Sequence, residues 1–189
     1  MNTSGINQLQ NDDYWAWKSV FASEIKQQTK IYRDYKKKGN SHIDVFSLAS
    51  NALVFHKLNQ GCLNIIKHEI GLPMVHFNTI VGLESGGFIQ GPLLAQFLGV
   101  PFIPIRRGGY LPGEIYRHDY RGEYGQQVIE IQKDNFCEKP RVIIIDDIMQ
   151  TGNTLQAAQE LVSSIPAAEI VGTFSIFEIL SLKGAQKLD

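Results

Sequence analysis

Residues 142–162, VIIIDDIMQTGNTLQAAQELV, decide how the chain folds. The apolar run 142–145 is typical of a buried strand, and Asp146 and Asp147 follow at its carboxyl end. A polar turn then leads into TLQAAQELV, whose apolar residues recur at helical spacing. The segment therefore predicts a strand, a loop and a helix in that order, which is the repeating unit of an α/β fold.

The flanking sequence extends this pattern, because strands alternate with helices and predict a mostly parallel central sheet flanked by helices. In such sheets ligands bind at the carboxyl ends of the strands, where we place the loops 84–87, 106–124 and 146–154. We expect one compact domain, with an N-terminal region over 1–50 and a core over 51–189. The expected elements are loose residues 1–10, a helix over 13–28, a charged connection over 31–42, a helix over 50–70, a strand over 74–83, a helix over 88–99, a strand over 100–105, a long loop over 106–124, strands over 126–132 and 141–147, a helix over 154–164 and a strand over 168–179.

The composition limits the class of protein. Of the 189 residues 43% are hydrophobic, which is enough for a sizeable core. The formal net charge of -1 argues against a nucleic-acid binder, which usually carries a basic excess. Cys62 and Cys137 match no metal-binding spacing. Because no signal peptide and no long apolar run are present, we expect a cytoplasmic protein that binds no membrane.

The loop 150–154, QTGNT, has the features of a phosphate cradle. The start of the helix that follows leaves backbone N–H groups without partners and carries partial positive charge. Gly152 lets the backbone approach an anion closely, and Asn153 tolerates unusual dihedral angles. Thr151 and Thr154 add hydroxyl donors. These features predict a site for one phosphate group.

The two carboxylates suit another part of the same ligand. Ionised Asp146 and Asp147 only accept hydrogen bonds, so they fit a sugar diol, and they also fit Mg²⁺ or its waters. A nucleoside triphosphate site is not expected, because the sequence GxxxxGK[ST] is absent. The pattern favours a sugar phosphate with vicinal hydroxyls. The alternative is that the acids simply end a strand and a threonine caps a helix.

The segment 142–162 resembles the 5-phosphoribosyl 1-diphosphate (PRPP) motif of the type I phosphoribosyltransferases. Three further segments are similar to those of adenine phosphoribosyltransferases: 81–100, VGLESGGFIQGPLLAQFLGV; 111–134, LPGEIYRHDYRGEYGQQVIEIQKD; and 177–188, FEILSLKGAQKL. The resemblance covers about residues 78–188, more than half of the chain. The sequence is thus identified as a diverged member of this family, with the type I phosphoribosyltransferase fold and a small N-terminal hood.

The resemblance implies an activity and a set of partners. Adenine and PRPP give AMP and diphosphate in this family, a reaction of purine salvage. Mg²⁺ enters mainly on the diphosphate of PRPP, so no metal ligands are assigned to the chain itself. Because relatives are usually homodimers, we expect a homodimer here.

The resemblance also implies a role for each matching residue. Glu123 corresponds to the candidate acid/base near the purine, and Tyr124 to a residue that shields the site when its loop closes. Ile148 is expected to pack on the base, and the peptide between Glu84 and Ser85 to be cis. The other assignments are Asp146 and Asp147 to the ribose, Gln150, Thr151, Gly152, Asn153 and Thr154 to the 5-phosphate, and Glu84, Ser85, Gly86, Arg106 and Arg107 to the diphosphate.

The chain departs from the family pattern around the diphosphate and the base. Gly86 stands where an arginine is usual, and Tyr110 where a lysine is usual. Two cations that would stabilise the leaving diphosphate are therefore missing, with Mg²⁺, Arg106 and Arg107 left to compensate. The segment 38–44, KGNSHID, retains only the glycine and the aspartate of the usual hood sequence.

These departures leave two alternatives open. The first is a protein of the same fold that binds PRPP or a nucleotide for regulation, with weak or no catalysis. The second is transfer of the phosphoribosyl group to a different base, because the altered hood removes the usual apolar contacts around adenine. His42, in the hood segment, is a candidate to stack on such a base. The cradle itself is unaffected, so PRPP binding is the firmer expectation.

Overall fold

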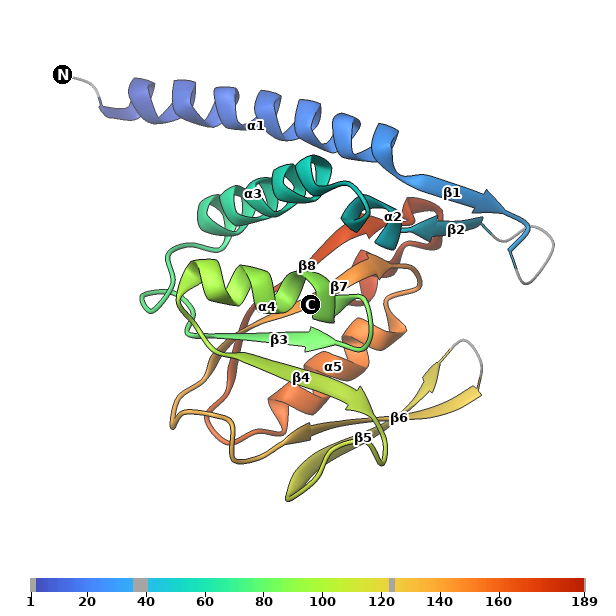
Figure 1. Ribbon diagram of the computed structural model, residues 1–189. Helices are drawn as coiled ribbons and strands as arrows, with labels where there is room; N and C mark the ends of the chain where they lie inside the picture. Colours follow the sequence, from blue (N-terminus) through green and yellow to red (C-terminus); the bar gives the residue numbers. More distant parts are fainter. Residues whose placement is uncertain (1–2, 36–40, 123–124, 189) are drawn as a thin grey trace. The chain divides into compact units, whose positions relative to one another are not determined.

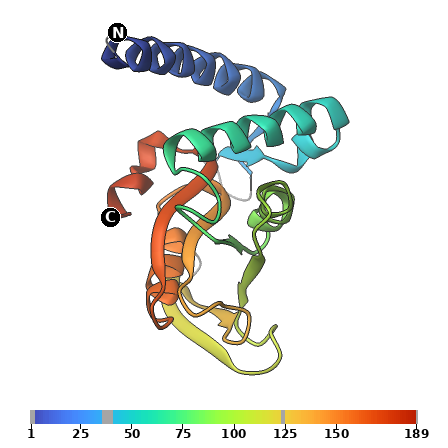
Figure 2. The same cartoon turned by 90° about the vertical axis from the view of Figure 1, so that its left-hand side faces the viewer.

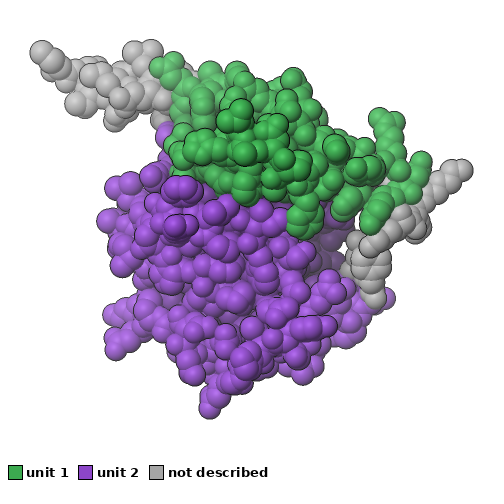
Figure 3. All heavy atoms as spheres, viewed as in Figure 1, with its two compact units in different colours: residues 1–65 green, residues 66–189 purple. Residues whose placement is uncertain are grey.

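The structure is a computed structural model that describes residues 3–35, 41–122 and 125–188. The backbone groups into two compact units, Met1–Ile65 and Ile66–Asp189, which are coloured separately in Figure 3. None of the helices within the described ranges is long and apolar enough to cross a membrane.

The first unit is mainly helical (Figure 1). Its core includes the buried side chains of Phe21, Ile25, Leu58 and Cys62. A Cβ atom at Gly61 would overlap the ring of Phe21, so glycine allows the first and last of its helices to pack closely. The elements are α1 (Thr3–Gln28), β1 (Lys30–Arg33), β2 (Ser41–Asp44), α2 (Phe46–Ala49) and most of α3 (Ala52–Glu69).

Two expectations for this region were wrong. Residues 3–10 are helical rather than loose, because no proline interrupts the start of α1. The charged connection contains an antiparallel pair, β1 with β2, and His42 of β2 stacks on Tyr35 with ring centroids 4.6 Å apart. Residues 36–40, which include Lys36, Lys37 and Lys38 and part of the hood segment, lie outside the described residues. The thiol of Cys62 is inert, since burial raises its pKa to about 12.

The second unit contains a six-stranded sheet in the order β5-β6-β4-β3-β7-β8. The four strands from β4 to β8 in this order are parallel, and β6 and β5 continue the sheet antiparallel. The mostly parallel α/β fold predicted from the sequence is confirmed. The elements are β3 (Thr79–Leu83), α4 (Gly87–Leu98), β4 (Phe102–Arg107), β5 (Ile115–Gly122), β6 (Gly125–Gln132), β7 (Arg141–Met149), α5 (Asn153–Ser163), β8 (Glu169–Glu178) and the 3₁₀ turns η1 (Leu180–Leu182) and η2 (Gly184–Lys187).

The two helices of this unit cover opposite faces of the sheet (Figure 2). From the centre of the sheet, β3-α4-β4 advances in one direction and β7-α5-β8 in the other, so crossovers of the usual right hand place α4 and α5 on opposite faces. The core between the sheet and α5 is apolar, as the alternation along the strands requires. Its members include Val81, Leu83, Ile103, Ile105, Val142, Ile144, Leu155, Ala158 and Leu161. The chain order reverses between β3 and β7, and this is where such sheets bind ligands.

Three boundaries differ from the sequence-based expectation. Residues 74–78 precede β3 as a turn, where Met74 has a φ of 62°. Most of the predicted loop 106–124 is strand: β5 pairs with β6 over its whole length. The segment IYRHDYRG, residues 115–122, is recognised as a strand only from its pairing with β6. Strand β7 continues to Met149, beyond the predicted end at residue 147, because β8 pairs with it that far.

Candidate active site

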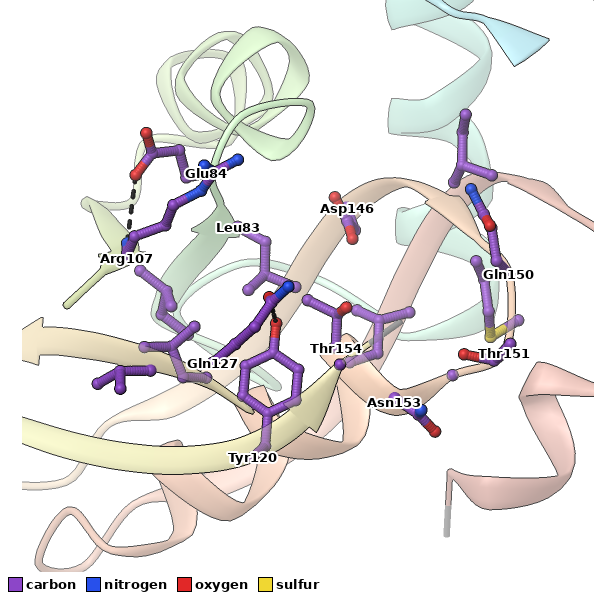
Figure 4. A pocket seen from close by; sticks show the side chains of 18 of the residues that line it. Leu83, Glu84, Arg107, Tyr120, Gln127, Asp146, Gln150, Thr151, Asn153 and Thr154 are labelled. Carbon is purple, nitrogen blue, oxygen red and sulfur yellow. Dashed lines mark hydrogen bonds between the residues drawn. The ribbon is translucent and has the colours of Figure 1, made fainter. Parts of the chain in front are cut away.

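One cavity of about 270 Å³ lies at the carboxyl ends of the central strands, within the second unit. Figure 4 shows Glu84 and Arg107 at one end, Gln150 and Thr151 at the other, and Asp146 between them. The residues that line the cavity come from four segments that are separated in sequence, within 83–84, 105–107, 120–129 and 146–155. It is large enough for a sugar phosphate.

The phosphate end is formed by the loop between β7 and α5. Gly152 is the N-cap of α5 and has a φ of 79°, the left-handed region that favours glycine. A Cβ atom on Gly152 would lie 2.5 Å from the carbonyl oxygen of Gly184, so glycine is required here for space as well as for conformation. The first N–H groups of α5 have no acceptor within the helix, and Gly152, Asn153 and Thr154 line this end of the cavity. This geometry suits one phosphate group.

The side chain of Asn153 connects this loop to two other segments. Its Oδ1 accepts a hydrogen bond from Nζ of Lys187 at 2.5 Å, and its Nδ2 donates to the carbonyl oxygen of Arg121 in β5 at 3.4 Å. Lys187 follows Gly184 in the C-terminal turn that packs under the loop. The phosphate loop is thereby supported from both sides.

The two acids point to different faces of the sheet, as neighbouring residues of a strand must. Asp146 lines the cavity, on the same side as Ile148. Burial, together with the charge of Asp147, raises the pKa of Asp146 well above its ordinary value. Hydroxyl donors of a bound diol would favour its ionised form. Asp147 faces the loop after β3, where its carboxyl group occupies the space in which a side chain at Gly86 would begin.

The opposite end of the cavity is formed by the loops after β3 and β4. The peptide between Glu84 and Ser85 is cis, as the resemblance implied. Arg106 is already paired: its Nε lies 3.2 Å from Oε2 of Glu84, and its guanidinium carbon lies 5.0 Å from the centre of the Tyr110 ring. The pairing with Arg106 lowers the pKa of Glu84. Arg107, whose backbone N–H also donates to Glu84, is the exposed cation of this end.

A buried carboxylate, missed by the sequence analysis, fixes the loop after β4. Glu130 of β6 is 1% exposed and accepts hydrogen bonds from the backbone N–H groups of Gly109, Tyr110 and Leu111 at 2.7–2.8 Å. Burial opposes its ionisation, but the three donors outweigh burial and lower its pKa. The pair of glycines at 108–109 was the available signal in the sequence that this loop presents backbone donors, because glycine has no side chain to cover its N–H group. The partner could be identified only once β6 was known to lie beside β4.

The antiparallel strands contribute a second feature that the sequence did not reveal. The hydroxyl of Tyr120 on β5 donates to Oε1 of Gln127 on β6 at 2.8 Å, and both side chains line the cavity (Figure 4). The two residues face each other in the register of the strands. They form the cavity wall that faces Asp146 and Thr154.

The structure brings most of the predicted site residues together. Ser85, Gly86 and Asp147 do not line the cavity, although they lie in the segments that border it. Glu123 and Tyr124, the predicted acid/base and shielding residues, lie outside the described residues. The predicted residues that line the cavity are Glu84, Arg106, Arg107, Asp146, Ile148, Gln150, Thr151, Gly152, Asn153 and Thr154.

The acidic side chains of the cavity fit Mg²⁺ that enters with the substrate. Within the described ranges, no three His, Cys, Asp or Glu side chains gather closely enough to hold a metal ion. Two carboxylates line the cavity: Glu84 is paired with Arg106, and Asp146 could reach the ion or its waters. An ion held mainly by a diphosphate therefore fits these residues better than a metal bound by the protein alone.

Comparison with known proteins agrees with this geometry. The family model for the phosphoribosyl transferase domain matches residues 64–184. Adenine phosphoribosyltransferase 1 of Saccharomyces cerevisiae is 38% identical over 169 residues, which cover 89% of each chain. The chain belongs to the adenine phosphoribosyltransferase family. Adenine phosphoribosyltransferase of Caenorhabditis elegans is 37% identical to this family member over 166 residues, 87% of this chain and 86% of the relative.

Solved structures extend the likeness to three dimensions. The Saccharomyces cerevisiae adenine phosphoribosyltransferase complexed with D-2,5-dideoxy-2,5-imino-altritol 1,6-bisphosphate and adenine has a TM-score of 0.84 and 36% identity, and covers 90% of this chain and 96% of its own. The Giardia lamblia enzyme complexed with 9-deazaadenine has a TM-score of 0.76 and 29% identity. This match covers 88% of this chain and 90% of the Giardia lamblia chain. This phosphoribosyltransferase therefore shares its fold with enzymes crystallised with purines.

Proposed function

We propose that the protein is an adenine phosphoribosyltransferase, which converts adenine and PRPP into AMP and diphosphate. The observation that carries the proposal is the cavity itself, because a phosphate loop, an acid and two arginines border one space of about 270 Å³ in that order. This order matches the 5-phosphate, the ribose and the diphosphate of PRPP. Relatives that bear this name at 37–38% identity support the choice of adenine.

The phosphate loop anchors the substrate. Backbone N–H groups at the start of α5 and the hydroxyls of Thr151 and Thr154 hold the 5-phosphate. Asp146 accepts hydrogen bonds from the ribose hydroxyls, with Asp147 at the border of the ribose and diphosphate regions. Because the sugar is held at its 5-phosphate and at its ribose hydroxyls, C1′ is fixed for attack by the base. This positioning removes much of the entropic barrier.

The diphosphate binds at the other end. Arg107 and the backbone of residues 84–87 receive it, while Arg106, already paired with Glu84, orders the loop. Mg²⁺, carried mainly by the diphosphate, would neutralise charge on the leaving group. Negative charge on the diphosphate increases as the bond to C1′ breaks, so a cation here contributes most in the transition state.

The base step needs one proton acceptor. N9 of adenine forms the new bond to C1′, the bond from C1′ to oxygen breaks, and diphosphate leaves with the electron pair. The proton of N9 passes to the carboxylate of Glu123, and Tyr124 excludes water that would hydrolyse the sugar. Ile148 supplies an apolar surface for the purine ring. We further propose a homodimer that works in the cytoplasm, as the family resemblance implies.

Rates with a panel of bases test this function. AMP formation from adenine, PRPP and Mg²⁺ is followed by absorbance, beside hypoxanthine, guanine and other bases at equal concentration. We expect adenine to react at an ordinary enzymatic rate, on the order of 1–10³ per second, and the others much more slowly. PRPP binding without consumption of any base would contradict an enzymatic function. Faster consumption of another base would overturn the choice of adenine.

A further inference from the structure

The hairpin of β5 and β6 contributes a side-chain pair to the cavity that the proposed reaction does not use. Tyr120 and Gln127 are partners in the register of the two strands, and both line the cavity. The hydroxyl of Tyr120 donates to Oε1 of Gln127 at 2.8 Å. Figure 4 shows the pair on the wall that faces Asp146 and Thr154. It therefore borders the part of the cavity assigned to the ribose and its 5-phosphate.

Two contacts fix the orientation of the Gln127 amide. The ring of Tyr120 packs against the apolar core between the sheet and α5, which holds its hydroxyl in place. The amide also lies over the bare backbone of Gly122, because a Cβ atom added there would lie 2.8 Å from Cδ of Gln127. Oε1 is the end of the amide that faces Tyr120. The other end, Nε2 with its two N–H donors, is therefore left for a ligand.

The two facing walls of the cavity offer complementary groups to a sugar hydroxyl. Ionised Asp146 only accepts hydrogen bonds, so a ribose hydroxyl donates its proton there. The oxygen of the same hydroxyl keeps lone pairs that can accept a hydrogen bond from the other wall. An N–H of Gln127 meets this need without adding a charge. A phosphate group alone, held by the loop 150–154, does not require this contact.

We propose that Gln127 is a substrate-binding residue whose Nε2 donates to a ribose hydroxyl held by Asp146. Tyr120 is its positioning residue, because the phenol hydroxyl directs the amide. This inference rests on the proposed function, in which the ribose of PRPP lies beside Asp146. The sugar is then bound from both walls, by an acceptor on β7 and by a donor on β6. Gln127 should consequently distinguish a sugar phosphate from phosphate alone.

Titration calorimetry with ribose 5-phosphate and with inorganic phosphate tests this distinction. Gln127→Met keeps the length of the side chain and removes the amide. We expect its Kd for ribose 5-phosphate to rise about three- to tenfold, the usual loss for one neutral hydrogen bond, and its Kd for inorganic phosphate to change less than about twofold. Gln126→Met is the matched control, because the neighbouring side chain is exposed and does not line the cavity. It should change neither affinity.

A double-mutant cycle tests the role of Tyr120. Tyr120→Phe removes only the hydroxyl that orients the amide, so we expect the Kd for ribose 5-phosphate to rise about two- to threefold. Beside Gln127→Met the same substitution should have no further effect, because no amide remains to be oriented. Additive losses in the double variant would overturn the positioning role of Tyr120.

The two ligands also separate this inference from a purely structural role of Gln127. An equal loss of affinity for both ligands in Gln127→Met would mean that Gln127 acts through the fold of the hairpin, and would overturn the inference. Unchanged affinity for ribose 5-phosphate would overturn it as well. A wild type that binds ribose 5-phosphate but forms no AMP from adenine and PRPP would contradict the proposed function alone. A wild type that binds no ribose 5-phosphate would contradict both.

Discussion

The two ends of the cavity differ in how they are built. The phosphate end is a continuous segment, residues 146–154, in which the strand, the glycine turn and the helix start follow one another. The diphosphate end is assembled from the segments after β3 and β4 and fixed by Glu130 of β6. The first end keeps the family motif nearly intact, whereas the second has lost two cations.

The difference shows where variation is tolerated. At the phosphate end, the conformation of Gly152 and the close approach of Gly184 leave no alternative residue. At the diphosphate end, Arg106 is neutralised by Glu84, and Tyr110 covers its guanidinium. We therefore expect substitutions within residues 146–154 to weaken PRPP binding strongly and substitutions at the diphosphate end to weaken it less.

Gly152→Ala should have the largest effect. Alanine at a φ of 79° is strained, and its Cβ would lie 2.5 Å from the oxygen of Gly184, so the loop must move. We expect PRPP affinity to fall by about 100-fold or more, as calorimetry would measure, since a shift of about 1 Å can cost that much in a positioned site. Gly113→Ala is the matched control, because Gly113 also has a φ of 79° but has no atom within 4 Å of the added methyl. Equal losses of affinity in both variants would mean that strain alone is responsible.

Asp146→Asn should come next. The amide keeps the shape but loses the charge that receives the ribose hydroxyls, which is worth about 10- to 100-fold in PRPP affinity. Asp119→Asn, at an exposed position on β5, serves as the control. If calorimetry with ribose 5-phosphate and with PRPP finds both affinities unchanged, Asp146 does not hold the ribose.

Glu130→Gln tests the diphosphate end through stability and pH. One oxygen that accepts a backbone N–H becomes a donor, so we expect a loss of about 1–3 kcal/mol in the free energy of unfolding at pH 7. Because the folded-state pKa of Glu130 is lowered, its contribution is fully present above the unfolded pKa of about 4.3. That contribution disappears as the pH falls through the folded-state pKa.

Denaturant unfolding between pH 7 and pH 3 measures this dependence, with exposed Glu114→Gln as the control. The difference between Glu130→Gln and the wild type should shrink as the solution becomes acidic. A difference that stays constant with pH would mean that the charge of Glu130 does not hold the loop.

Lys187→Met should have the smallest effect. It removes the hydrogen bond to Asn153 but leaves the packing of Gly184 under the loop. An exposed contact of this kind contributes about 0.2–1 kcal/mol, so we expect PRPP affinity to fall less than about fivefold. Lys183→Met in the same turn is the control. A loss as large as that of Gly152→Ala would mean that Lys187 binds the substrate directly.

The sequence predicted the strand, the turn and the helix of the phosphate end, because everything needed for them lies in one segment. The apolar run of β7, the two acids and the glycine turn are local signals, and the structure brings them to one edge of the sheet. Residues at the other end depend on pairing that no local pattern encodes. Glu130 is an unremarkable polar residue until β6 lies beside β4, and β5 looked like a loop for the same reason. Gly86 was interpreted as a lost cation, and its contact with Asp147 required the neighbouring strands.

The central claim is that this cavity binds PRPP through the loop 150–154 and Asp146. Calorimetric titration of PRPP with Mg²⁺ into the wild type, Gly152→Ala and Gly113→Ala tests it most directly. We predict one site per chain with a Kd between about 1 μM and 1 mM, the usual range of substrate affinities, lost in Gly152→Ala and retained in Gly113→Ala. No heat of binding to the folded wild type, or equal binding to all three proteins, would contradict the claim.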